Sequence, residues 1–307
     1  MHFIDNIIEK KKSWLLISAV IIILTLLMFL IRGLNFGIDF TGGTIIHLEV
    51  GQDFETEEIR NVLAGYGLED SVIQDAGGDG EDSEVVIRTV SLDDATINDV
   101  VTDMQEEFSA MPDDPILRSN SVGGIIGAEL RQQAFIALGI AVVAIILYIT
   151  FRFEYNFALA AITALVNDVF FVLLLFSILQ FEINEPFIAA LLTIMGYSIN
   201  DTIVIFDRIR ENRSLYKNYK EEEVVSMSLK RTITRSINTS LTTLIVLTSL
   251  FVFGGVTIRP FVAALLFGVL IGTYSSIFIA PNAWLLLQKR QKAKKQFSPK
   301  EEPEQGV

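Results

Sequence analysis

The sequence predicts an α-helical membrane protein with six membrane-spanning helices and one external α+β domain between the first two of them. Hydrophobic residues make up 51% of the 307 residues, and the mean hydropathy is positive at +0.47. Six separate apolar stretches approach the roughly 20 residues that a helix needs to cross a bilayer. The segment 32–132, between the first two stretches, instead alternates between helical and strand-like periodicity.

The six apolar stretches are predicted to be transmembrane helices, after a short N-terminal segment at 1–13. The predicted spans are 14–31, 133–151, 157–179, 187–206, 237–253 and 261–287. The first stretch is longer than the apolar region of a signal peptide, and no small-residue cleavage site follows it before Arg32. We therefore interpret it as a retained anchor.

The basic residues predict which side of the membrane each connection lies on. The residues that decide this are Lys10, Lys11, Lys12, Arg152, those of the basic loop predicted at 207–236 and those of the tail 288–307. All of them fall on one side, which the positive-inside rule assigns to the cytoplasm. Both termini are therefore expected in the cytoplasm and the segment 32–132 outside. Trp14 and Trp284 fall at the cytoplasmic interface, where we expect aromatic anchors.

Composition excludes several classes of site. Without cysteine there is no disulfide framework, thiolate metal site or thiol nucleophile. His2 and His47 are the only histidines, which argues against a histidine metal site. The segment Phe36–Arg118 carries 21 Asp and Glu residues against three arginines, so we do not expect it to bind nucleic acid. We interpret this charge as a solvated acidic surface.

The external segment is predicted to be a ferredoxin-like domain, because its elements follow the order βαββαβ. The expected strands and helices are Thr44–Val50, Thr56–Tyr66 (helix), Ser71–Asp75, Glu84–Val90, Asp94–Met111 (helix) and Ile116–Val122. The glycine-rich stretch Gly77–Asp82 is interpreted as a flexible hairpin, since no Gly-Lys-Ser/Thr of a phosphate loop follows it. His47 lies on a predicted strand and is interpreted as structural.

The fourth predicted span contains the polar run Asn200-Asp201-Thr202. An ionisable residue at membrane depth is costly and is by default a functional candidate. At 1.5 Å of rise per residue, Asp201 lies roughly 9 Å inside the cytoplasmic end of the helix, which Asp207 and Arg208 mark. We therefore predict that Asp201 is an ion-coupling residue, with Asn200 and Thr202 beside it.

Asp168 is a second carboxylate at membrane depth, beside Asn167 in the third predicted span. Two interpretations stay open for it. Asp168 either takes part in ion coupling or makes a static hydrogen bond between helices.

The fifth span begins with a polar stripe at positions i, i+3, i+4 and i+7, formed by Arg235, Asn238, Thr239 and Thr242. Such a stripe is expected to face other helices rather than lipid. Arg235 is expected either to pair with Asp201 or Asp207, or to extend to the cytoplasmic interface.

Two clusters of small residues stand out. Gly33, Gly37, Gly42 and Gly43 lie where the first span passes into the external domain, which suits either a hinge or a rigid corner. In the sixth span, a face of small residues is interpreted as a surface for close helix packing. Its members are Gly268, Gly272, Ser275 and Ser276.

Two long motifs resemble signatures of the SecF proteins, which belong to the SecD/SecF family of the RND superfamily. The first is Gly37-Ile38-Asp39-Phe40-Thr41-Gly42-Gly43, and the second is GYSINDTIVIFDRIRE at Gly196–Glu211. Shorter matches are Ser121–Gly124, Arg235–Thr243 and Gly272–Ala280. The resemblance covers nearly the whole chain and implies one six-span half of an RND-like membrane region.

The resemblance also implies a function. Proteins of this family pair with SecD and assist SecYEG, with YajC as a further partner. With SecD they use the ion-motive force to promote a late stage of preprotein translocation across the cytoplasmic membrane. By motif, Asp201 and Arg235 are the ion-conducting residues. No cofactor is implied beyond a coupling ion, H⁺ or Na⁺. Relatives often carry a histidine where this chain has Asn167, so a proton relay through this position is excluded and sodium stays open.

Three other functions are open to test. A small-molecule exporter of the RND type is disfavoured because one six-span chain supplies half of the usual membrane region. A membrane enzyme is disfavoured because the sequence lacks Gly-x-Gly-Asp and His-Glu-x-x-His motifs. A purely structural scaffold for SecD remains as a third alternative, which a substitution of Asp201 tests.

Overall fold

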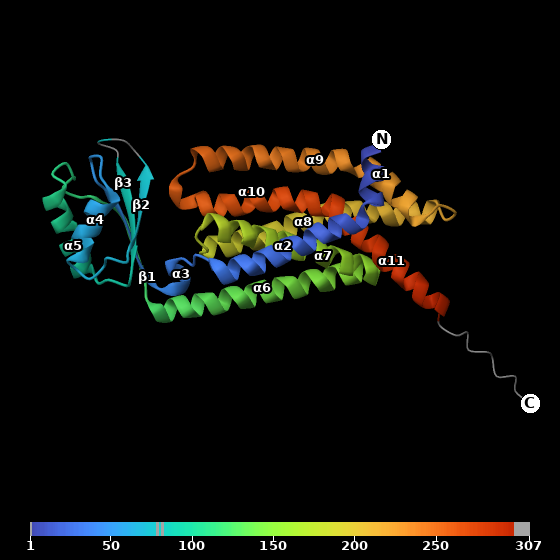
Figure 1. Cartoon of the computed structure of the whole chain (residues 1–307), viewed down its shortest axis with the longest axis horizontal. Coiled ribbons are helices and arrows are strands. Elements are labelled where there is room, and N and C mark those ends of the chain that lie inside the picture. The colour runs from blue at the N-terminus through green and yellow to red at the C-terminus, as the bar shows by residue number, and fades with distance from the viewer. Residues whose placement is uncertain (1, 78–79, 81–82, 298–307) are drawn as a thin grey trace, which may run out of the picture. The chain divides into compact units, whose positions relative to one another are not determined.

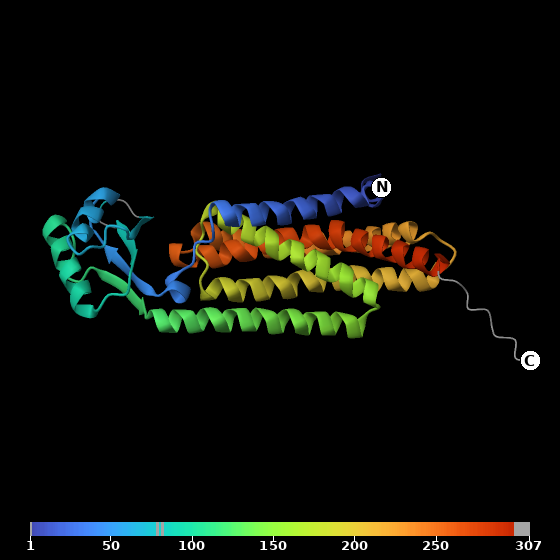
Figure 2. The same ribbon diagram turned by 60° about the horizontal axis from the view of Figure 1, so that its bottom comes forward.

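The computed structural model describes residues 2–77, 80 and 83–297. Its elements are drawn in Figure 1 and, after rotation, in Figure 2. The chain forms two compact units. We call them the helical unit, comprising Met1–Leu34, Leu138–Phe181 and Ala189–Val307, and the α+β unit, comprising Asn35–Ala137 and Glu182–Ile188.

Six helices in the described part of the chain are long and apolar enough to cross a membrane. They are α2 (Lys11–Ile31), α6 (Gly124–Arg152), α7 (Tyr155–Leu179), α8 (Glu185–Leu215), α9 (Glu221–Phe253) and a sixth at Arg259–Lys292. The sixth consists of α10 (Arg259–Tyr274), the π-helical turn η3 (Ser275–Ile279) and most of α11 (Ala280–Phe297). The prediction of a multi-pass membrane protein is confirmed. Two short helices, α1 (His2–Glu9) and η2 (Val256–Ile258), complete the helical unit.

The segment 207–236, which the sequence analysis predicts as a loop, is largely helical. Helix α8 continues to Leu215, and α9 already begins at Glu221. The side chain of Glu223 accepts a hydrogen bond from the backbone N–H of Lys220 at 3.2 Å, which caps the first turn of α9. The loop prediction was wrong because it was drawn from hydropathy, which marks where apolar residues end and not where a helix ends.

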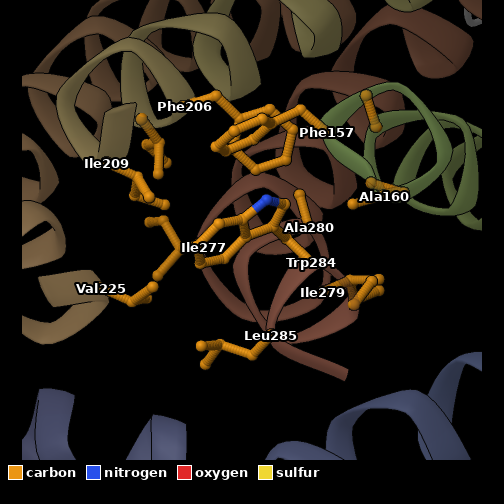
Figure 3. Close-up of a cluster of buried hydrophobic side chains, with 14 of the residues drawn as sticks. Phe157, Ala160, Phe206, Ile209, Val225, Ile277, Ile279, Ala280, Trp284 and Leu285 are labelled. Atoms are coloured by element: carbon orange, nitrogen blue, oxygen red, sulfur yellow. The ribbon is translucent and has the colours of Figure 1, made fainter. Parts of the chain in front are cut away.

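The core of the helical unit contains a cluster of buried hydrophobic side chains that includes three of its aromatic residues, Phe157, Phe206 and Trp284 (Figure 3). Trp284 is fully buried and stacks on Phe157, with ring centroids 4.9 Å apart and planes 18° apart. Phe206 packs edge-on against Phe157 at 5.0 Å. Trp284 is therefore a core residue, and the expectation that it is an interfacial anchor was wrong. Trp14 is partly buried, and its indole N–H donates to the carbonyl of Ile7 at 3.1 Å.

The α+β unit contains a four-stranded antiparallel sheet in the order β2-β3-β1-β4. The strands are β1 (Gly43–Glu49), β2 (Val72–Gly77), β3 (Glu84–Thr89) and β4 (Ile116–Val122). The helices are α3 (Ile38–Thr41), α4 (Thr56–Ala64) and α5 (Asp94–Glu107). The predicted element order is confirmed. Most of the expected hairpin Gly77–Asp82 lies outside the described residues, since only Gly77 and Gly80 are described.

Helices α4 and α5 cover one face of this sheet, because the apolar side chains of the strands and of both helices pack together at that face. Ile46 and Leu48 alternate with partly exposed residues along β1, as expected for a strand with one buried face. Ile59 and Val100 bring the apolar faces of α4 and α5 onto them. Asp93 caps α5 by accepting from the N–H of Thr96 at 3.0 Å. His47 points to the opposite face, where burial and the nearby Arg118 and Arg88 lower its pKa.

Candidate functional site

Asp168 lies at the centre of a buried polar network in the helical unit. Its carboxylate is fully buried and accepts hydrogen bonds from two hydroxyl groups through Oδ2. Ser198 of α8 donates at 2.5 Å, and Ser275 of η3 donates at 2.8 Å. The side-chain amide of Asn167 is 3.4 Å from Oδ1. Buried carboxylates need such donors because desolvation without hydrogen bonds is costly.

The network extends to a fourth helix and along α8. Ser18 of α2 donates to Oδ1 of Asn167 at 2.6 Å. Thr202 of α8 and Ser276 of η3 share a hydrogen bond of 2.8 Å, and Ser276 also donates to the carbonyl of Ser198 at 3.3 Å. We call this set the Asp168 network; it comprises Ser18, Asn167, Asp168, Ser198, Thr202, Ser275 and Ser276. All seven side chains are buried.

The π-helical turn η3 lets two consecutive serines reach this network. Ser275 bonds to the Asp168 carboxylate, and Ser276 bonds to Thr202. The N–H of Ala280 bonds to the carbonyl of Ser275, five residues earlier, which widens the helix at this point. Turns of this kind occur frequently at functional sites. Neither hydrogen bond was predicted from the sequence, in which the two serines were interpreted only as small residues for close packing.

The glycines of the same face do pack as predicted. A Cβ atom on Gly268 would collide with the side chain of Ile194, and one on Gly272 would lie 3.0 Å from Cβ of Ser198. Helix α10 therefore approaches α8 closely at these two glycines, as expected for a face of small residues. The close approach also places Ser198 within reach of the Asp168 network.

Asp201 lies on α8, and its hydrogen-bond partner differs from those of Asp168. Its Oδ1 accepts a hydrogen bond from the hydroxyl of Ser236 on α9 at 2.7 Å. Its Oδ2 is buried and has no hydrogen-bond partner among the described residues. Of its two sequence neighbours, Thr202 joins the Asp168 network, whereas Asn200 is exposed on the surface of the chain.

Arg235 makes no ion pair with Asp201 or Asp207 within the part of the chain that the structure describes. Asp207 instead pairs with Arg152 of α6 at 3.2 Å and with Arg210 of its own helix at 3.1 Å. The side chain of Arg235 is exposed. The alternative in which Arg235 pairs with either aspartate is therefore not the arrangement seen in this structure.

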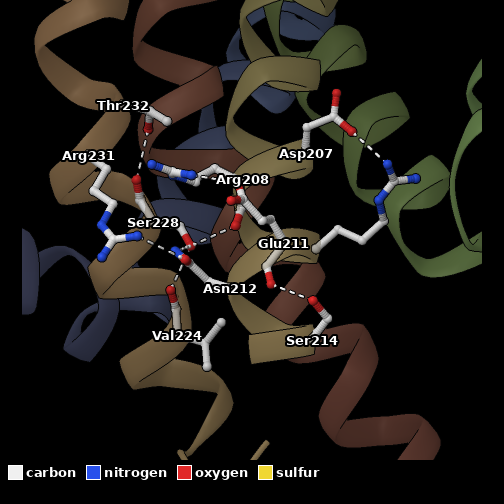
Figure 4. Close-up of polar contacts among 10 residues, drawn as sticks. Asp207, Arg208, Glu211, Asn212, Ser214, Val224, Ser228, Arg231 and Thr232 are labelled. Carbon is white, nitrogen blue, oxygen red and sulfur yellow. Dashed lines mark hydrogen bonds and ion pairs between the residues drawn. The ribbon is translucent and has the colours of Figure 1, made fainter. Parts of the chain in front are cut away.

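Polar contacts join α8 and α9 beyond the end of their apolar segments (Figure 4). The side-chain amide of Asn212 donates to the hydroxyl of Ser228 at 2.8 Å, and both side chains are fully buried. Arg208 pairs with Glu211 on the same helix at 2.5 Å. Arg208 and Asp207 therefore contribute to surface ion pairs rather than to the buried site.

Helix α9 has two polar faces, and the stripe predicted to face other helices is the one that this chain leaves exposed. The predicted stripe of Arg235, Asn238, Thr239 and Thr242 is exposed. The face that contacts the bundle carries Ser236, Ser240 and Thr243. Ser240 accepts from Thr273 of α10 at 2.5 Å, and Thr243 is 3.3 Å from the hydroxyl of Tyr197. The spacing Ser236, Ser240, Thr243 and Leu247 was the signal that could have identified this face.

The motif Gly37–Gly43 is fastened to the first residues of α8. The carboxylate of Asp39 accepts a hydrogen bond from the backbone N–H of Glu185, the first residue of α8, at 3.0 Å. Gly37 and Ile183 are joined by a backbone hydrogen bond of 2.9 Å, and Ile183 and Asn35 by one of 2.7 Å. An acidic group at a helix N-terminus is stabilising. The motif therefore holds the start of the helix that carries Asp201.

The two glycines that end the motif form a tightly packed turn. Gly42 has φ +74° and Gly43 has φ +139°, which are conformations that favour glycine. A Cβ atom on Gly42 would lie 2.8 Å from the backbone of Gly124, and one on Gly43 would lie 2.5 Å from the carbonyl of Thr89. Thr41 donates to the carbonyl of Gly37 at 3.1 Å. These contacts fix the conformation of the turn inside the α+β unit, to which all of these residues belong.

The fold and the site together define a polytopic membrane protein with buried carboxylates among its helices and a small α+β unit. Residues 101–290 match the family of the protein export membrane protein SecD/SecF, C-terminal part. Residues 28–53 match the SecD/SecF GG motif. The chain therefore belongs to the SecD/SecF family of protein export membrane proteins.

Several curated proteins are similar over most of their length. The chain is 43% identical to the protein translocase subunit SecF of Desulfurispirillum indicum, covering 86% of this chain and 85% of that protein. It is 40% identical to SecF of Acidaminococcus fermentans, covering 94% and 98%. The protein translocase subunit SecDF of Bacillus subtilis is 38% identical over 92% of this chain, which corresponds to 38% of that longer protein.

Solved structures of SecDF are similar in fold. The crystal structure of SecDF from Thermus thermophilus, a translocon-associated membrane protein, superposes with a TM-score of 0.82 at 34% identity. The match covers 94% of this chain and 40% of that one. A second SecDF structure, in a super-membrane-facing form, has a TM-score of 0.67 at 35% identity. This chain thus spans about 40% of the SecDF proteins it resembles.

Proposed function

We propose that this chain is a SecF-type transport subunit that assists protein export and has no catalytic activity of its own. Its similarity to SecF proteins over nearly their whole length supports this proposal. In the proposed role it acts with the SecYEG translocon, with YajC as a further partner, on preproteins at a late stage of crossing. Both termini would be cytoplasmic, and the α+β unit, with the sheet order of a ferredoxin-like domain, would lie outside.

SecD is the partner that the relatives imply, since SecDF proteins carry a segment like this chain within one longer polypeptide. The uncovered stripe of α9 supports such a partner. Arg235 and Asn238 lie exposed on a helix long and apolar enough to span the membrane. Polar groups facing lipid are costly, whereas a second helical bundle would cover them and supply hydrogen-bond partners.

The ion-motive force would be coupled at the intramembrane carboxylates. Asp201 is the principal candidate, and the single observation that carries this proposal is that its Oδ2 is buried without a hydrogen-bond partner. An H⁺ or Na⁺ ion bound there would satisfy this oxygen and neutralise the charge. Arg235 would act from the uncovered stripe, while Asp168, Asn200 and Thr202 would complete the ion-coupling set. No cofactor beyond the ion is proposed.

Ion binding moves a protein only if two conformations differ in ion affinity. The hydrogen bond between Asp201 and Ser236 joins α8 to α9, so neutralising the carboxylate would weaken that contact. The first residue of α8, Glu185, donates its backbone N–H to Asp39 of the Gly37–Gly43 motif. A shift of α8 would therefore be transmitted along one continuous helix to the α+β unit.

The substitution Asp201→Asn is expected to remove the part of preprotein translocation that depends on an ion gradient. Translocation would be measured in vesicles that contain SecYEG, SecD and this protein, with and without a gradient. The amide has nearly the same shape as the carboxylate but carries no charge and does not take up a proton. With a gradient present, translocation by this variant should fall to the level that is measured without a gradient. Separate proton and sodium gradients would then name the ion.

The matched control is Thr193→Val, an exposed position on the same helix whose hydroxyl donates to the carbonyl of Ala189 on its own helix. This variant should retain the full response to the gradient. Equal levels of the assembled complex must be verified for both variants. A normal gradient response of Asp201→Asn would contradict ion coupling at this residue and favour a scaffold role for the chain.

A further inference from the structure

The α+β unit includes residues 182–184, which directly precede α8. Backbone hydrogen bonds join this segment to residues 35–37. The carboxylate of Asp39 accepts a further hydrogen bond from the N–H of Glu185. All of these partners precede β1 in the chain. These bonds therefore hold the start of α8 to the motif, but they do not tie it directly to the strands.

Glu182 adds a direct contact with the sheet. Its Oε2 lies 3.1 Å from Nη2 of Arg88 on β3, and the side chains of Glu182 and Arg88 are 11% and 24% exposed. Nη1 of the same guanidinium donates to Oε1 of Gln74 on β2 at 3.1 Å. Charge-assisted contacts are strong, and more so where water is largely excluded. One arginine therefore joins the segment before α8 to two strands.

The surroundings of Glu182 hold its carboxylate in this position. A Cβ atom on Gly37 would collide with this carboxylate, so the first glycine of the motif leaves room for it. The backbone N–H of Ile38 is hydrogen-bonded to Glu182. Burial raises the pKa of Glu182, the positive charge of Arg88 lowers it, and the negative charge of Asp39 raises it. Arg88 is therefore the main group that keeps the carboxylate charged.

Arg88 lies on an inner strand of the sheet. Strand β3 is between β2 and β1, and Arg88 is in register with Val72 on one side and Ile45 on the other. Its side chain lies on the face opposite to α4 and α5, because its neighbour Ile87 belongs to the core. Hydrogen-bond ladders hold an inner strand on both sides. A displacement of Arg88 is therefore carried to β1 and β2 together.

The ion pair lines a cavity of about 500 Å³ within the α+β unit. Gly37, Thr41 and Val90 are also in the cavity wall. Buried core residues are closely packed and resist displacement, whereas side chains that border a cavity have room to move. The contact between Arg88 and Glu182 can therefore form and break without repacking of the core.

We propose that Arg88 and Glu182 are a pair of positioning residues that make the sheet of the α+β unit follow a movement of α8. The origin of that movement, ion binding at Asp201, rests on the proposed function. Glu182 moves with the first turn of α8, and Arg88 carries β3 along with it. Without the ion pair, α8 moves but the strands no longer follow it.

Arg88→Gln and Glu182→Gln test this role in vesicles that contain SecYEG, SecD and the variant chain. Each substitution removes one charge of the pair. We expect the part of preprotein translocation that depends on an ion gradient to fall at least about threefold. Translocation without a gradient should stay unchanged at equal levels of the assembled complex, which separates positioning from loss of the fold. Arg88→Lys keeps the positive charge and should retain most of the gradient response.

Two further variants make the result specific to the pair. A chain with both Arg88→Gln and Glu182→Gln leaves neither charge buried without its partner. It should lose no more of the gradient response than either single variant, because all three lack the same contact. Arg118→Gln removes an exposed arginine from β4 of the same sheet and should keep the full response. A full response of Arg88→Gln, or an equal loss in Arg118→Gln, would overturn the proposal.

Amide hydrogen exchange of the purified full chain in detergent gives a measurement that does not depend on translocation. Arg88→Gln should accelerate exchange in Glu182–Ile188 several-fold. Exchange in α5 should stay as in the unaltered chain, since α5 packs on the other face of the sheet and reports whether the unit is folded. Unchanged exchange in Glu182–Ile188 would contradict a role of the ion pair in holding the start of α8.

The two proposals fail in distinguishable ways. If the unaltered chain gives no gradient-dependent translocation while Arg88→Gln accelerates exchange in Glu182–Ile188, the proposed function fails and the contact between the sheet and the start of α8 stands. If Arg88→Gln responds to the gradient as the unaltered chain does, the positioning role fails and the proposed function stands.

Discussion

The substitution Gly42→Ala is expected to destabilise the α+β unit by roughly 2–6 kcal/mol. Gly42 has φ +74° and ψ +161°, a region that is nearly exclusive to glycine and costs other residues about 1–3 kcal/mol. The added methyl group would also lie 2.8–2.9 Å from backbone atoms of Gly124, and overpacking of this kind costs about 1–3 kcal/mol more. Amide hydrogen exchange of β1 and β4 measures the loss, because these strands adjoin Gly42 and Gly124 and report opening of the unit.

Gly67→Ala is the matched control for this prediction. Gly67 has a similar φ of +70° in the same unit, but an added Cβ would meet no atom within 4 Å. Only the conformational cost of about 1–2 kcal/mol should appear. Exchange should therefore accelerate far more in Gly42→Ala than in Gly67→Ala. Equal exchange in the two variants would show that close packing against Gly124 contributes nothing.

Trp284→Ala is expected to destabilise the helical unit by about 3 kcal/mol, the lower end of the range for buried aromatic residues. The indole is fully buried against Phe157, so its removal leaves a cavity among α7, α8 and α11. The lower end applies because lipid tails are as apolar as this core, and mainly packing contacts are lost. The loss of stability is measured by thermal unfolding of the purified chain in detergent and, separately, by amide hydrogen exchange in α7 and α11.

Trp284→Phe separates packing from hydrogen bonding at this position. The indole N–H has no hydrogen-bond partner in the described structure, so phenylalanine removes no such bond and keeps a ring against Phe157. We expect this variant to retain most of the stability. If the Trp284→Ala and Trp284→Phe variants were equally stable, stacking of a ring at position 284 on Phe157 would not contribute to the stability of these helices.

The structure explains why the two intramembrane aspartates differ. Sequence position alone left both as candidates, since each lies within an apolar span. Asp168 has three hydrogen-bond donors around it, whereas Asp201 has one donor and one unpaired oxygen. Asn167 is the neighbour of Asp168 on α7, but the two hydroxyl donors come from α8 and η3, which are distant in the sequence. No spacing rule within one helix could have assigned them.

The sequence by itself determined the elements that depend on local patterns. Six apolar stretches specify six helices, because each one alone satisfies its backbone hydrogen bonds in lipid. Alternating and helical periods specify the order of strands and helices in the α+β unit, because each element buries one face. The placement of Asp201 inside an apolar helix also follows from the sequence alone.

The tertiary structure alone decided which side chains contact one another. The inward face of α9 carries Ser236 rather than Arg235, and Trp284 packs in the core rather than at an interface. The motif residue Asp39 caps α8, which begins far along the chain. These features depend on how whole helices pack against one another. Helix packing depends on many contacts between residues that are distant in the sequence, so no local stretch of sequence predicts it.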